Sequence, residues 1–359
     1  MKVFLTGAGG FLGSHLLGYI LKNTDWDVIA TDSFRHKGRC DRITTVIDRD
    51  CDYAPRVKVI THDLVAPFSS GEIDAIGPVD LVIAMASESH VDRSIDDPVP
   101  FVKNNVDVIL NTLELCRDVG PQMILLMSTD EVYGPCEPGH TMPEWSPILP
   151  SNPYSASKAA QEAIGISYWR TYNLPIVLLN VMNLYGEMQD AEKYIPRVIS
   201  SVLGGYEVNI HGEPDRIGSR HYLYAQNLAS AMVFIYNNLP AKLFTMQGAG
   251  EDIPRPDRYN IAGEKATDNL DLAEQIADII GEDLFYKLSG WNGRPGHDPH
   301  YSLDPSKLLA LGWKAPYSFE DGLADTVAWY LANPEWLEED LCVMVLIWIS
   351  SCMRSALRM

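Results

Sequence analysis

Two short segments carry side chains that could perform acid–base and redox chemistry on one substrate. In STDEVYG at residues 128–134, the carboxyls of Asp130 and Glu131 follow the hydroxyl of Thr129. In YSASK at residues 154–158, Tyr154 and Lys158 are four residues apart and share a helix face. Together these groups could support a redox step at one carbon and the elimination of water beside it.

A glycine-rich turn near the N-terminus predicts a dinucleotide site. TGAGGFLG at residues 6–13 follows an apolar stretch and opens a helical pattern. Gly7, Gly10 and Gly13 would permit a tight turn, close approach of a pyrophosphate and close packing of the helix on the strand. The alternative is a purely structural turn, but Asp32 ends the next strand, where a carboxylate would bind the adenosine ribose.

The residues around Asp32 favour NAD over NADP, because its carboxylate would repel a 2′-phosphate. Arg35 and Lys37 lie nearby and leave NADP open. Asp63 and Leu64 close the third strand, where they could contact adenine. The alternative for Asp63 is a simple turn or cap residue.

Tyr154 could remove a hydroxyl proton while hydride leaves the same carbon for NAD. A tyrosine ordinarily has a pKa of about 10. The ammonium of Lys158 and the charge of a nicotinamide are expected to lower it. YxxxK alone is common by chance, but the upstream turn and the strand ending in Ser128 favour the catalytic interpretation.

Asp130 and Glu131 would stand at the carboxyl edge of a fifth strand, where open α/β sheets hold their ligands. Adjacent acids in loops are usually solvated or cap a helix, and that remains the alternative. In one cleft the two carboxyls would titrate apart, so that one acts as acid and the other as base. A β-elimination requires that pairing.

Short apolar runs alternate with helical patterns through the first half and predict a doubly wound parallel sheet, a Rossmann α/β fold. The expected strands are residues 3–6, 27–31, 57–61, 81–85, 123–128 and 176–181, and the expected helices include 12–22, 99–119 and 153–172. The runs are nearly all apolar, as expected for strands covered on both faces. Residues 1–183 would form the NAD-binding domain with the catalytic residues.

After residue 183 the alternation ends, and residues 184–338 predict a smaller α+β lobe that binds the substrate. Some of its elements are expected to return to the main sheet. Helices are expected at 194–203, 227–238, 270–280 and 319–332, and strands at 207–211 and 258–262. The apolar run at 341–349, in a tail of residues 339–359, is too short to span a bilayer. It could pack on the body or a second subunit, or bind a membrane surface.

Composition excludes some classes of partner and site. The chain has 359 residues and a formal charge of −20, which argues against nucleic-acid binding. Its six cysteines form no close CxxC pair, and the first strand leaves no room for a signal peptide. A cytoplasmic protein with reduced thiols is therefore expected. The nine histidines lack HExxH-type spacing, so no metal site is predicted.

Several separated motifs make the chain resemble the extended short-chain dehydrogenase/reductase superfamily, and within it the nucleotide-sugar 4,6-dehydratases of the dTDP-glucose type. The motifs are TGAGGFLG, SESHVDRS at 87–94, STDEVYG, NPYSASKAA at 152–160, NLYG at 183–186, EKYIP at 192–196, RPGHD at 294–298 and WYLANPEW at 329–336. The adjacent Asp-Glu pair is the more selective part, because 4-epimerases generally lack it.

The resemblance implies a reaction and a set of site residues. Tyr154 would act with Lys158 and Thr129 in C4 oxidation, Glu131 would remove the C5 proton, and Asp130 would protonate the leaving 6-hydroxyl. Further NAD contacts would come from Phe11, Leu12, Ser33, Phe34, Arg35, Met85, Ala86, Ser87 and Asn104. Contacts to a nucleotide-diphosphate sugar would come from Ser89, Thr129, Asn183, Glu192, Lys193, Arg220, Asn269, Arg294 and His297.

The resemblance fixes the reaction more firmly than the substrate. Asn180, Glu187 and His221 differ from the residues that related enzymes usually carry near the nucleotide pocket. An NDP-hexose, most simply dTDP- or UDP-glucose, is the expected substrate. An epimerase, a 5,6-dehydratase and a non-catalytic dinucleotide-binding sensor remain the alternatives. The family likeness also implies a homodimer through the helices at 99–119 and 153–172, and no membrane span.

Overall fold

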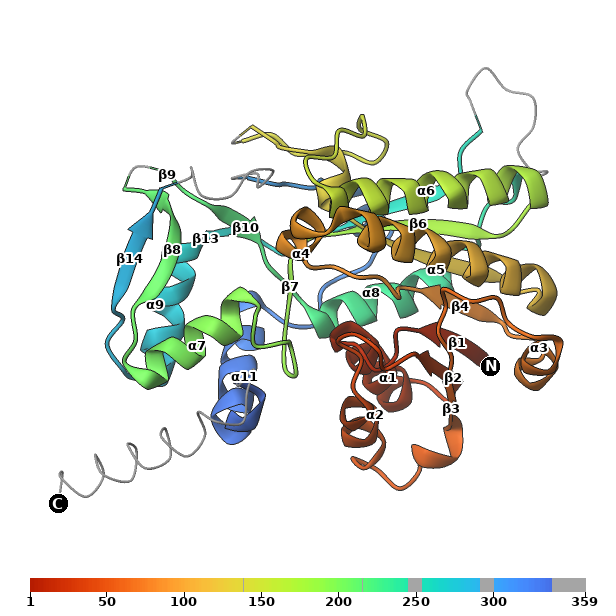
Figure 1. The fold of residues 1–359 in the computed structure, drawn as a ribbon, viewed down its shortest axis with the longest axis horizontal. Helices are drawn as coiled ribbons and strands as arrows, with labels where there is room; N and C mark the ends of the chain where they lie inside the picture. Colours follow the sequence, from red (N-terminus) through yellow and green to blue (C-terminus); the bar gives the residue numbers. More distant parts are fainter. Residues whose placement is uncertain (138, 215, 245–253, 291–299, 338–359) are drawn as a thin grey trace.

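The computed structural model describes residues 1–137, 139–214, 216–244, 254–290 and 300–337 (Figure 1). The apolar tail and the candidate ligands Arg294 and His297 lie outside these residues, so the expectations for them stay untested.

Seven strands form the central sheet in the order β12-β6-β5-β4-β1-β2-β3, and all six pairings are parallel. Their bounds are β1 Lys2–Thr6, β2 Asp27–Asp32, β3 Val57–Thr61, β4 Leu81–Ala84, β5 Met123–Thr129, β6 Ile176–Val181 and β12 Asp257–Ile261. The order in which the strands are added reverses between β1 and β4, and sheets of this kind bind ligands there, at the carboxyl ends of their strands. The predicted doubly wound fold is confirmed.

Helices cover both faces of this sheet. On one face α1 (Phe11–Asn23) packs against α8 (Ala225–Asn238), and on the other α5 (Pro98–Val119) packs against α6 (Pro153–Tyr172) (Figure 1). Alternating residues of β1 enter the two cores, with Val3 and Leu5 in the first and Phe4 in the second. This alternation explains why the strand reads as a continuous apolar run.

The edge strand β3 departs from the expected pattern of strands covered on both faces. Its Lys58, Val59 and Thr61 are exposed, and Val59 keeps 45% of its surface in solvent. Among the described residues, the strand has a neighbour only on the β2 side, and the helices pack mainly over the inner strands.

The second half forms the smaller α+β lobe, seen at the left of Figure 1. Its helices are α7 Tyr194–Gly204, α9 Asn269–Ile280 and α11 Phe319–Ala332, which contact one another. Its strands form small sheets in the orders β14-β8-β9, β10-β13 and β11-β7, with bounds β7 Leu184–Tyr185, β8 Val208–Glu213, β9 Arg216–Ile217, β10 Ser219–His221, β11 Leu223–Tyr224, β13 Ala266–Asp268 and β14 Tyr286–Ser289.

Two elements of the second half return to the main body. β12 pairs with β6 along its length, and α8 packs on α1. The remaining elements are short connections: α2 Cys40–Ile47, α3 Ser70–Ile76, α4 Val91–Asp96, α10 Ser306–Ala310 and the 3₁₀ turns η1 Ala54–Arg56, η2 Asp130–Tyr133 and η5 Pro334–Leu337. The boundary expected at residue 183 therefore separates the motifs of the first half from those of the second. It does not divide the central sheet, because β12 lies beyond it.

Candidate active site

The glycine-rich turn between β1 and α1 stands at the carboxyl ends of the central strands. Gly7 has a φ of +71°, which residues with a side chain rarely adopt. The N–H of Gly10 donates to the carbonyl oxygen of Gly7 over 3.0 Å, and a Cβ atom at Gly13 would overlap the same oxygen. The backbone therefore requires glycine at both Gly7 and Gly13, and a helix start at such a turn binds phosphate groups.

Asp32 orders this turn from the end of β2. Its Oδ2 accepts a hydrogen bond from the N–H of Gly9 over 2.9 Å, and its Oδ1 accepts one from Phe34 over 2.9 Å. Because each carboxylate oxygen accepts more than one hydrogen bond, Asp32 keeps acceptor capacity toward a ribose hydroxyl.

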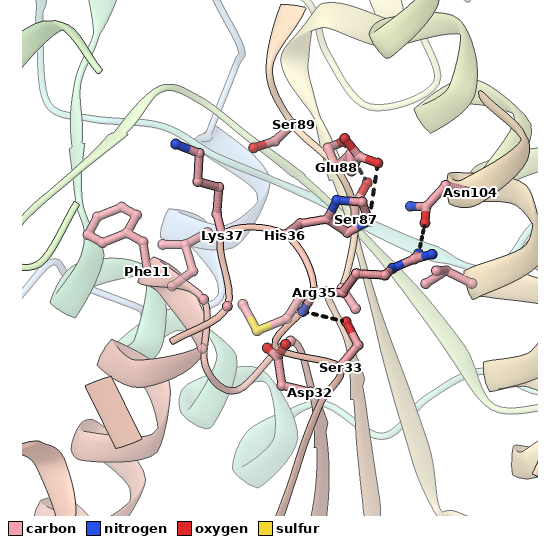
Figure 2. A pocket seen from close by; sticks show the side chains of 18 of the residues that line it. Phe11, Asp32, Ser33, Arg35, His36, Lys37, Ser87, Glu88, Ser89 and Asn104 are labelled. Carbon is pink, nitrogen blue, oxygen red and sulfur yellow. Dashed lines mark hydrogen bonds and ion pairs between the residues drawn. The ribbon is translucent and has the colours of Figure 1, made fainter. Parts of the chain in front are cut away.

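A cleft opens beside this turn and holds about 1280 Å³ of space, its open mouth included. All the residues expected at the cofactor except Phe34 line it: Gly7, Gly10, Phe11, Leu12, Gly13, Asp32, Ser33, Arg35, Asp63, Leu64, Met85, Ala86, Ser87, Asn104, Tyr154 and Lys158. Figure 2 shows the part around Phe11, Asp32 and Ser33. Phe34 does not line the cleft. It has a φ of +51°, and its ring packs beside Gly9.

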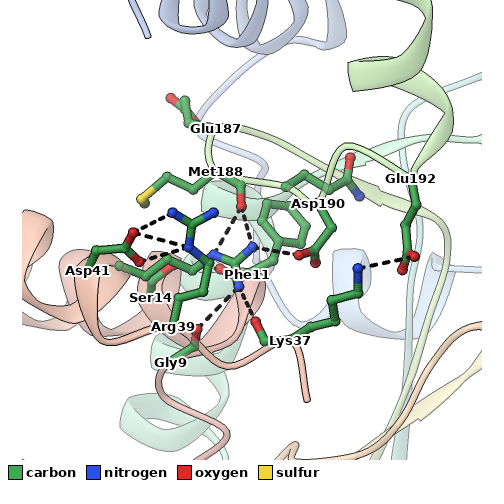
Figure 3. A network of polar contacts seen from close by, with 12 residues as sticks. Gly9, Phe11, Ser14, Lys37, Arg39, Asp41, Glu187, Met188, Asp190 and Glu192 are labelled. Carbon is green, nitrogen blue, oxygen red and sulfur yellow. Dashed lines mark hydrogen bonds and ion pairs between the residues drawn. The ribbon is translucent and has the colours of Figure 1, made fainter. Parts of the chain in front are cut away.

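Three consecutive basic residues reach from the loop after β2 to three different partners around the cleft. Figure 2 shows Arg35 with Asn104 and His36 beside Glu88, and Figure 3 shows Lys37 with Glu192. Arg35 donates to Asn104 of α5 over 2.9 Å and lies 3.3 Å from Asp63. His36 lies 3.4 Å from Glu88, and Lys37 lies 3.3 Å from Glu192. The basic side chains are 39% to 46% exposed, so water screens these pairs. The same contacts occupy Arg35 and Lys37, the two cations that could have met a 2′-phosphate.

Arg42 ties the glycine-rich turn to the loop before α7. Its fully buried guanidinium donates to the carbonyl oxygens of Lys37 over 2.6 Å, Gly9 over 3.3 Å and Met188 over 2.9 Å. It also lies 3.0 Å from the carboxylate of Asp190. Figure 3 shows these groups converging from both halves of the chain. The cleft is therefore enclosed by residues that are far apart in the sequence.

Tyr154 and Lys158 lie near the start of α6. Asn152 caps this helix by accepting the N–H of Ser155 over 2.9 Å, and Pro153 occupies the first helical position. The Lys158 ammonium donates to the carbonyl oxygen of Met127 over 2.7 Å and to Gln161 over 2.6 Å. Burial lowers the pKa of Lys158 to about 8.

The pKa of Tyr154 moves opposite to the sequence-based expectation. Burial raises it, the negative charges of Glu131 and Asp130 raise it further, and a hydrogen bond with Thr129 acts the other way. Within the protein chain itself, Lys158 therefore does not lower the pKa of Tyr154 as expected. Burial is the largest cause, because the phenolate loses its hydration, and the two carboxyls add to it in the same poorly solvated space.

The three residues Thr129, Asp130 and Glu131 leave β5 and form the start of the turn η2. The hydroxyl of Thr129 donates to Oδ1 of Asp130 over 2.8 Å. Asn152, the cap of α6, donates to Oε2 of Glu131 over 3.2 Å. One asparagine thus links the acid pair to the helix that carries Tyr154.

Burial raises the pKa of both carboxyls into the neutral range. The value is about 6 for Asp130 and about 7 for Glu131, where the charge of Asp130 adds to the effect of burial. The positive charge of Arg220 lowers both. Near neutral pH the pair can therefore hold a proton and also accept one, as an acid–base pair requires.

Only some of the residues expected to bind the substrate or act on it border the cleft. Ser89, Glu192 and Lys193 line the cleft, whereas Thr129, Asp130, Glu131, Asn183, Arg220 and Asn269 are not among the residues that border it. Arg220 is buried, lies 4.8 Å from the Tyr301 ring centre and acts electrostatically on the acid pair. Asn269 accepts a hydrogen bond from the hydroxyl of Tyr222 over 2.8 Å and so links the start of α9 to the connection between β10 and β11.

Two residues that differ from the family pattern, Asn180 and Glu187, do not line the cleft. Asn180 is fully buried in β6 and donates to the carbonyl oxygen of Thr129 over 3.1 Å, behind the acid pair. Glu187 accepts the Tyr224 hydroxyl over 2.8 Å, and its carbonyl oxygen bonds to His15 of α1 over 2.7 Å. Asn180 thus contacts the turn of the acid pair, and Glu187 connects the loop after β7 with α1.

Sequence reasoning missed several residues of the site. The additional lining includes His36, Glu88, Arg93, Gln189 and Asp190. Arg93 and the helix cap Asn152 stood inside motifs that were recognised, SESHVDRS and NPYSASKAA. The motifs around Arg93 and Asn152 identified the region of the site. Only the folded structure shows which residues these two side chains contact.

The described part of the chain contains one group of possible metal ligands and no helix that could span a membrane. Only Asp50, Cys51 and Asp52 come together there as possible metal ligands, and all three are exposed and away from the cleft lining. In the same ranges, every helix is too short or too polar to cross a membrane.

Comparison with known proteins places residues 4–326 within the family model described as GDP-mannose 4,6 dehydratase. The chain is 33% identical to dTDP-glucose 4,6-dehydratase 1 of Escherichia coli K12, over 94% of this chain and 95% of that protein. It is 32% identical to the low-salt glycan biosynthesis protein Agl12 of Haloferax volcanii, over 93% and 100%. A crystal structure of dTDP-glucose 4,6-dehydratase from Streptomyces venezuelae with NAD bound superposes with a TM-score of 0.80 at 30% identity, over 94% and 99%.

Proposed function

The chain belongs to the GDP-mannose 4,6 dehydratase family, and from this premise we propose that it is an NAD-dependent hydro-lyase. Its substrate is an NDP-hexose, which it converts to the NDP-4-keto-6-deoxyhexose and water. The observation that carries the proposal is that the Thr129 hydroxyl hydrogen-bonds to both Asp130 and Tyr154, while Asn152, the cap of the helix that carries Tyr154, donates to Glu131 over 3.2 Å. A base for the 4-hydroxyl proton and an acid–base pair lie within one small space. This arrangement suits oxidation at one carbon and elimination at its neighbour.

The lining of the cleft suits NAD. Gly7 and Gly13 allow the tight turn that begins α1 at the cleft, where a helix start can bind a pyrophosphate, and Asp32 presents a carboxylate at the end of β2. When bound, NAD supplies the hydride acceptor for C4, the hydride donor for C6 and a positive charge that favours the phenolate of Tyr154.

Each proton transfer has a group in the structure to perform it. Tyr154 takes the proton of the 4-hydroxyl as C4 is oxidised to a ketone. Glu131 then removes the acidified C5 proton, and Asp130 protonates the leaving 6-oxygen so that water departs. Glu131 returns its proton to C5 when C6 is reduced, which leaves a surplus proton on Tyr154 and a deficit on Asp130.

Thr129 provides a route for balancing that surplus. Its hydroxyl hydrogen-bonds to Asp130 over 2.8 Å and also to Tyr154. A proton taken from the 4-hydroxyl can therefore pass from Tyr154 through Thr129 to Asp130. The proton that leaves with the water is then replaced by one taken from the substrate.

The first substrate to test is dTDP-glucose, because relatives with this activity in their names align over nearly the whole chain. Purified protein would be incubated with dTDP-, UDP-, CDP- and GDP-glucose. We expect a 4-keto product with an alkaline chromophore and loss of one water by mass spectrometry. C4 epimers without loss of water would identify an epimerase, and nucleotide binding without turnover would identify a sensor.

A homodimer and a cytoplasmic location complete the proposal. α5 and α6 pack side by side on one face of the sheet, and Val99 and Tyr172 on them are 74% and 45% exposed. These helices would form the subunit contact. Light scattering on the purified protein should give twice the chain mass of 40.0 kDa; a single chain mass would contradict the dimer. Fractionation of the source cells tests the location.

A further inference from the structure

A buried ion pair lies behind the acid pair and has no part in the proton transfers. Arg258 of β12 and Glu162 of α6 meet at 2.7 Å, and their side chains are only 1% and 0% exposed. Removing two charges from water is costly, and such a pair is weak evidence for stability alone. Its place behind the acid pair therefore indicates a role other than stability.

The pair is connected to both ends of the turn that carries the acids. At one end, Asn180 donates to Oε1 of Glu162 over 2.8 Å and to the carbonyl oxygen of Thr129 over 3.1 Å. At the other end, Arg258 donates to the hydroxyl of Tyr133 over 2.9 Å. Asp130 and Glu131 lie between these two anchors.

The surroundings hold the guanidinium in one orientation. The Trp145 ring centre lies 4.2 Å from its central carbon, within the range of a cation–π contact. Tyr133 and Asn180 are themselves buried, at 1% and 0% exposure. Groups with so little room transmit a displacement to their partners.

Glu162 also belongs to the helix of the redox pair. It follows Lys158 by four residues, so the two side chains lie on one face of α6. Its negative charge raises the pKa of Lys158 against the effect of burial. The ion pair thus connects the helix of Tyr154 and Lys158 with the turn of Asp130 and Glu131.

We propose that Glu162, Arg258 and Asn180 are positioning residues that hold the acid–base turn, residues 129–133, in register with the redox helix. The proposal rests on the proposed function for its kinetic consequence, because oxidation and elimination must share one bound sugar. A misplacement of about 1 Å costs roughly 10²-fold in rate. Loosening the turn should slow elimination more than C4 oxidation.

The first test is Tyr133→Phe, which removes one anchor and leaves Glu162 and Lys158 in place. We expect kcat to fall about tenfold with little change in KM, since the turn is displaced and the sugar still binds. Reduced nicotinamide should accumulate during turnover, seen by its absorbance. Wild-type kcat without accumulation would overturn the proposal.

The matched control is Asp257→Asn on the same strand. Asp257 is buried like Arg258 but pairs with the exposed Lys242 over 3.0 Å, away from the turn. This variant should keep the wild-type ratio of oxidation to elimination. Accumulation of reduced nicotinamide in this variant as well would mean that any disturbance of β12 produces the effect, and the proposal would fail.

A second test does not depend on activity. The double variant Glu162→Met/Arg258→Met replaces the ion pair by apolar side chains, an exchange that often leaves stability unchanged. We expect amide hydrogen exchange at residues 129–134 to become at least about tenfold faster than in Asp257→Asn, because both anchors are lost. Unchanged protection there would refute the positioning role even if no nucleotide sugar is turned over. Faster exchange without turnover by the wild type would refute only the proposed function.

Discussion

The rim and the floor of the cleft hold their charged groups in opposite ways. The rim consists of Arg35, His36 and Lys37, which reach across to their partners with 39% to 46% of their own surface exposed. The floor is defined as Lys158, which borders the cleft, and Thr129, Asp130 and Glu131, which do not border it but interact with Tyr154, with the buried pair behind them. Asp130 and Lys158 are 3% and 2% exposed. Water and salt screen the first set and barely reach the second.

This difference separates the residues that link the edges of the cleft from those that would carry out the chemistry. Exposed pairs contribute little free energy each and can open and re-form. Buried groups shift their pKa values, as Asp130, Glu131 and Lys158 do, and a displaced partner leaves an unsatisfied charge. We therefore expect substitutions in the floor to have larger effects than substitutions in the rim.

The largest effect should follow Tyr154→Phe. Removing this hydroxyl takes away the group that receives the 4-hydroxyl proton, so C4 oxidation should slow roughly 10⁴-fold. Single-turnover absorbance of reduced nicotinamide measures this step. Oxidation at the wild-type rate would remove Tyr154 from the reaction.

Glu131→Gln should produce a smaller loss with a different signature. C4 oxidation should still occur, but elimination should slow roughly 10²- to 10³-fold, because the amide is a poor base. Reduced nicotinamide would then stay trapped, and no water would be released. Full dehydratase activity would contradict the role of Glu131 as base.

Asp130→Asn should stabilise the protein at alkaline pH while impairing turnover. Burial raises the pKa of Asp130 from 3.8 to about 6, so its stabilising contribution is complete below pH 3.8 and is lost as pH rises through 6. An amide avoids this loss. At pH 8 the variant should exceed the wild type by about 3 kcal/mol in unfolding free energy, with little difference at pH 3.5.

Chemical denaturation at the two pH values provides the measurement. A stability difference between variant and wild type that is the same at both pH values would show that folding does not raise the pKa of Asp130. Such a result would also weaken the contrast between the floor and the rim.

The smallest effect is expected in the rim, from Lys37→Met. Loss of its pair with Glu192 should change the unfolding free energy by less than about 1 kcal/mol. High salt should reduce the difference from the wild type further. A salt-independent loss of several kcal/mol would place Lys37 with the floor residues and break the comparison.

Local patterns were sufficient for most of the fold. The helix predicted at residues 153–172 has those bounds in the structure, where Asn152 and Pro153 mark its start and Asn173 its end. The glycine-rich turn was equally readable, since its conformation depends on Gly7 and Gly13 themselves. The exposed edge strand β3 was misjudged because its composition does not record that a neighbour is missing on one side.

The candidate site was only partly readable. The positions of Tyr154, Lys158, Asp130 and Glu131 followed from short spacings, because α6 and the end of β5 are local features. The direction of the Tyr154 pKa shift did not, since it depends first on the burial of the hydroxyl and then on two carboxyls from another segment. Arg258 is separated from Tyr133 by more than a hundred residues, and no spacing rule joins them.

The sequence by itself determined the turn that suits a dinucleotide, the order of strands and helices, and the side chains available for acid–base and redox work. These depend on backbone sterics and on neighbours within a few residues. Only the tertiary structure decided which charges are buried, which carboxyls share a space, and that β12 brings Arg258 behind the acid pair. Burial and charge interaction depend on distance in space, which the chain sets only when it folds.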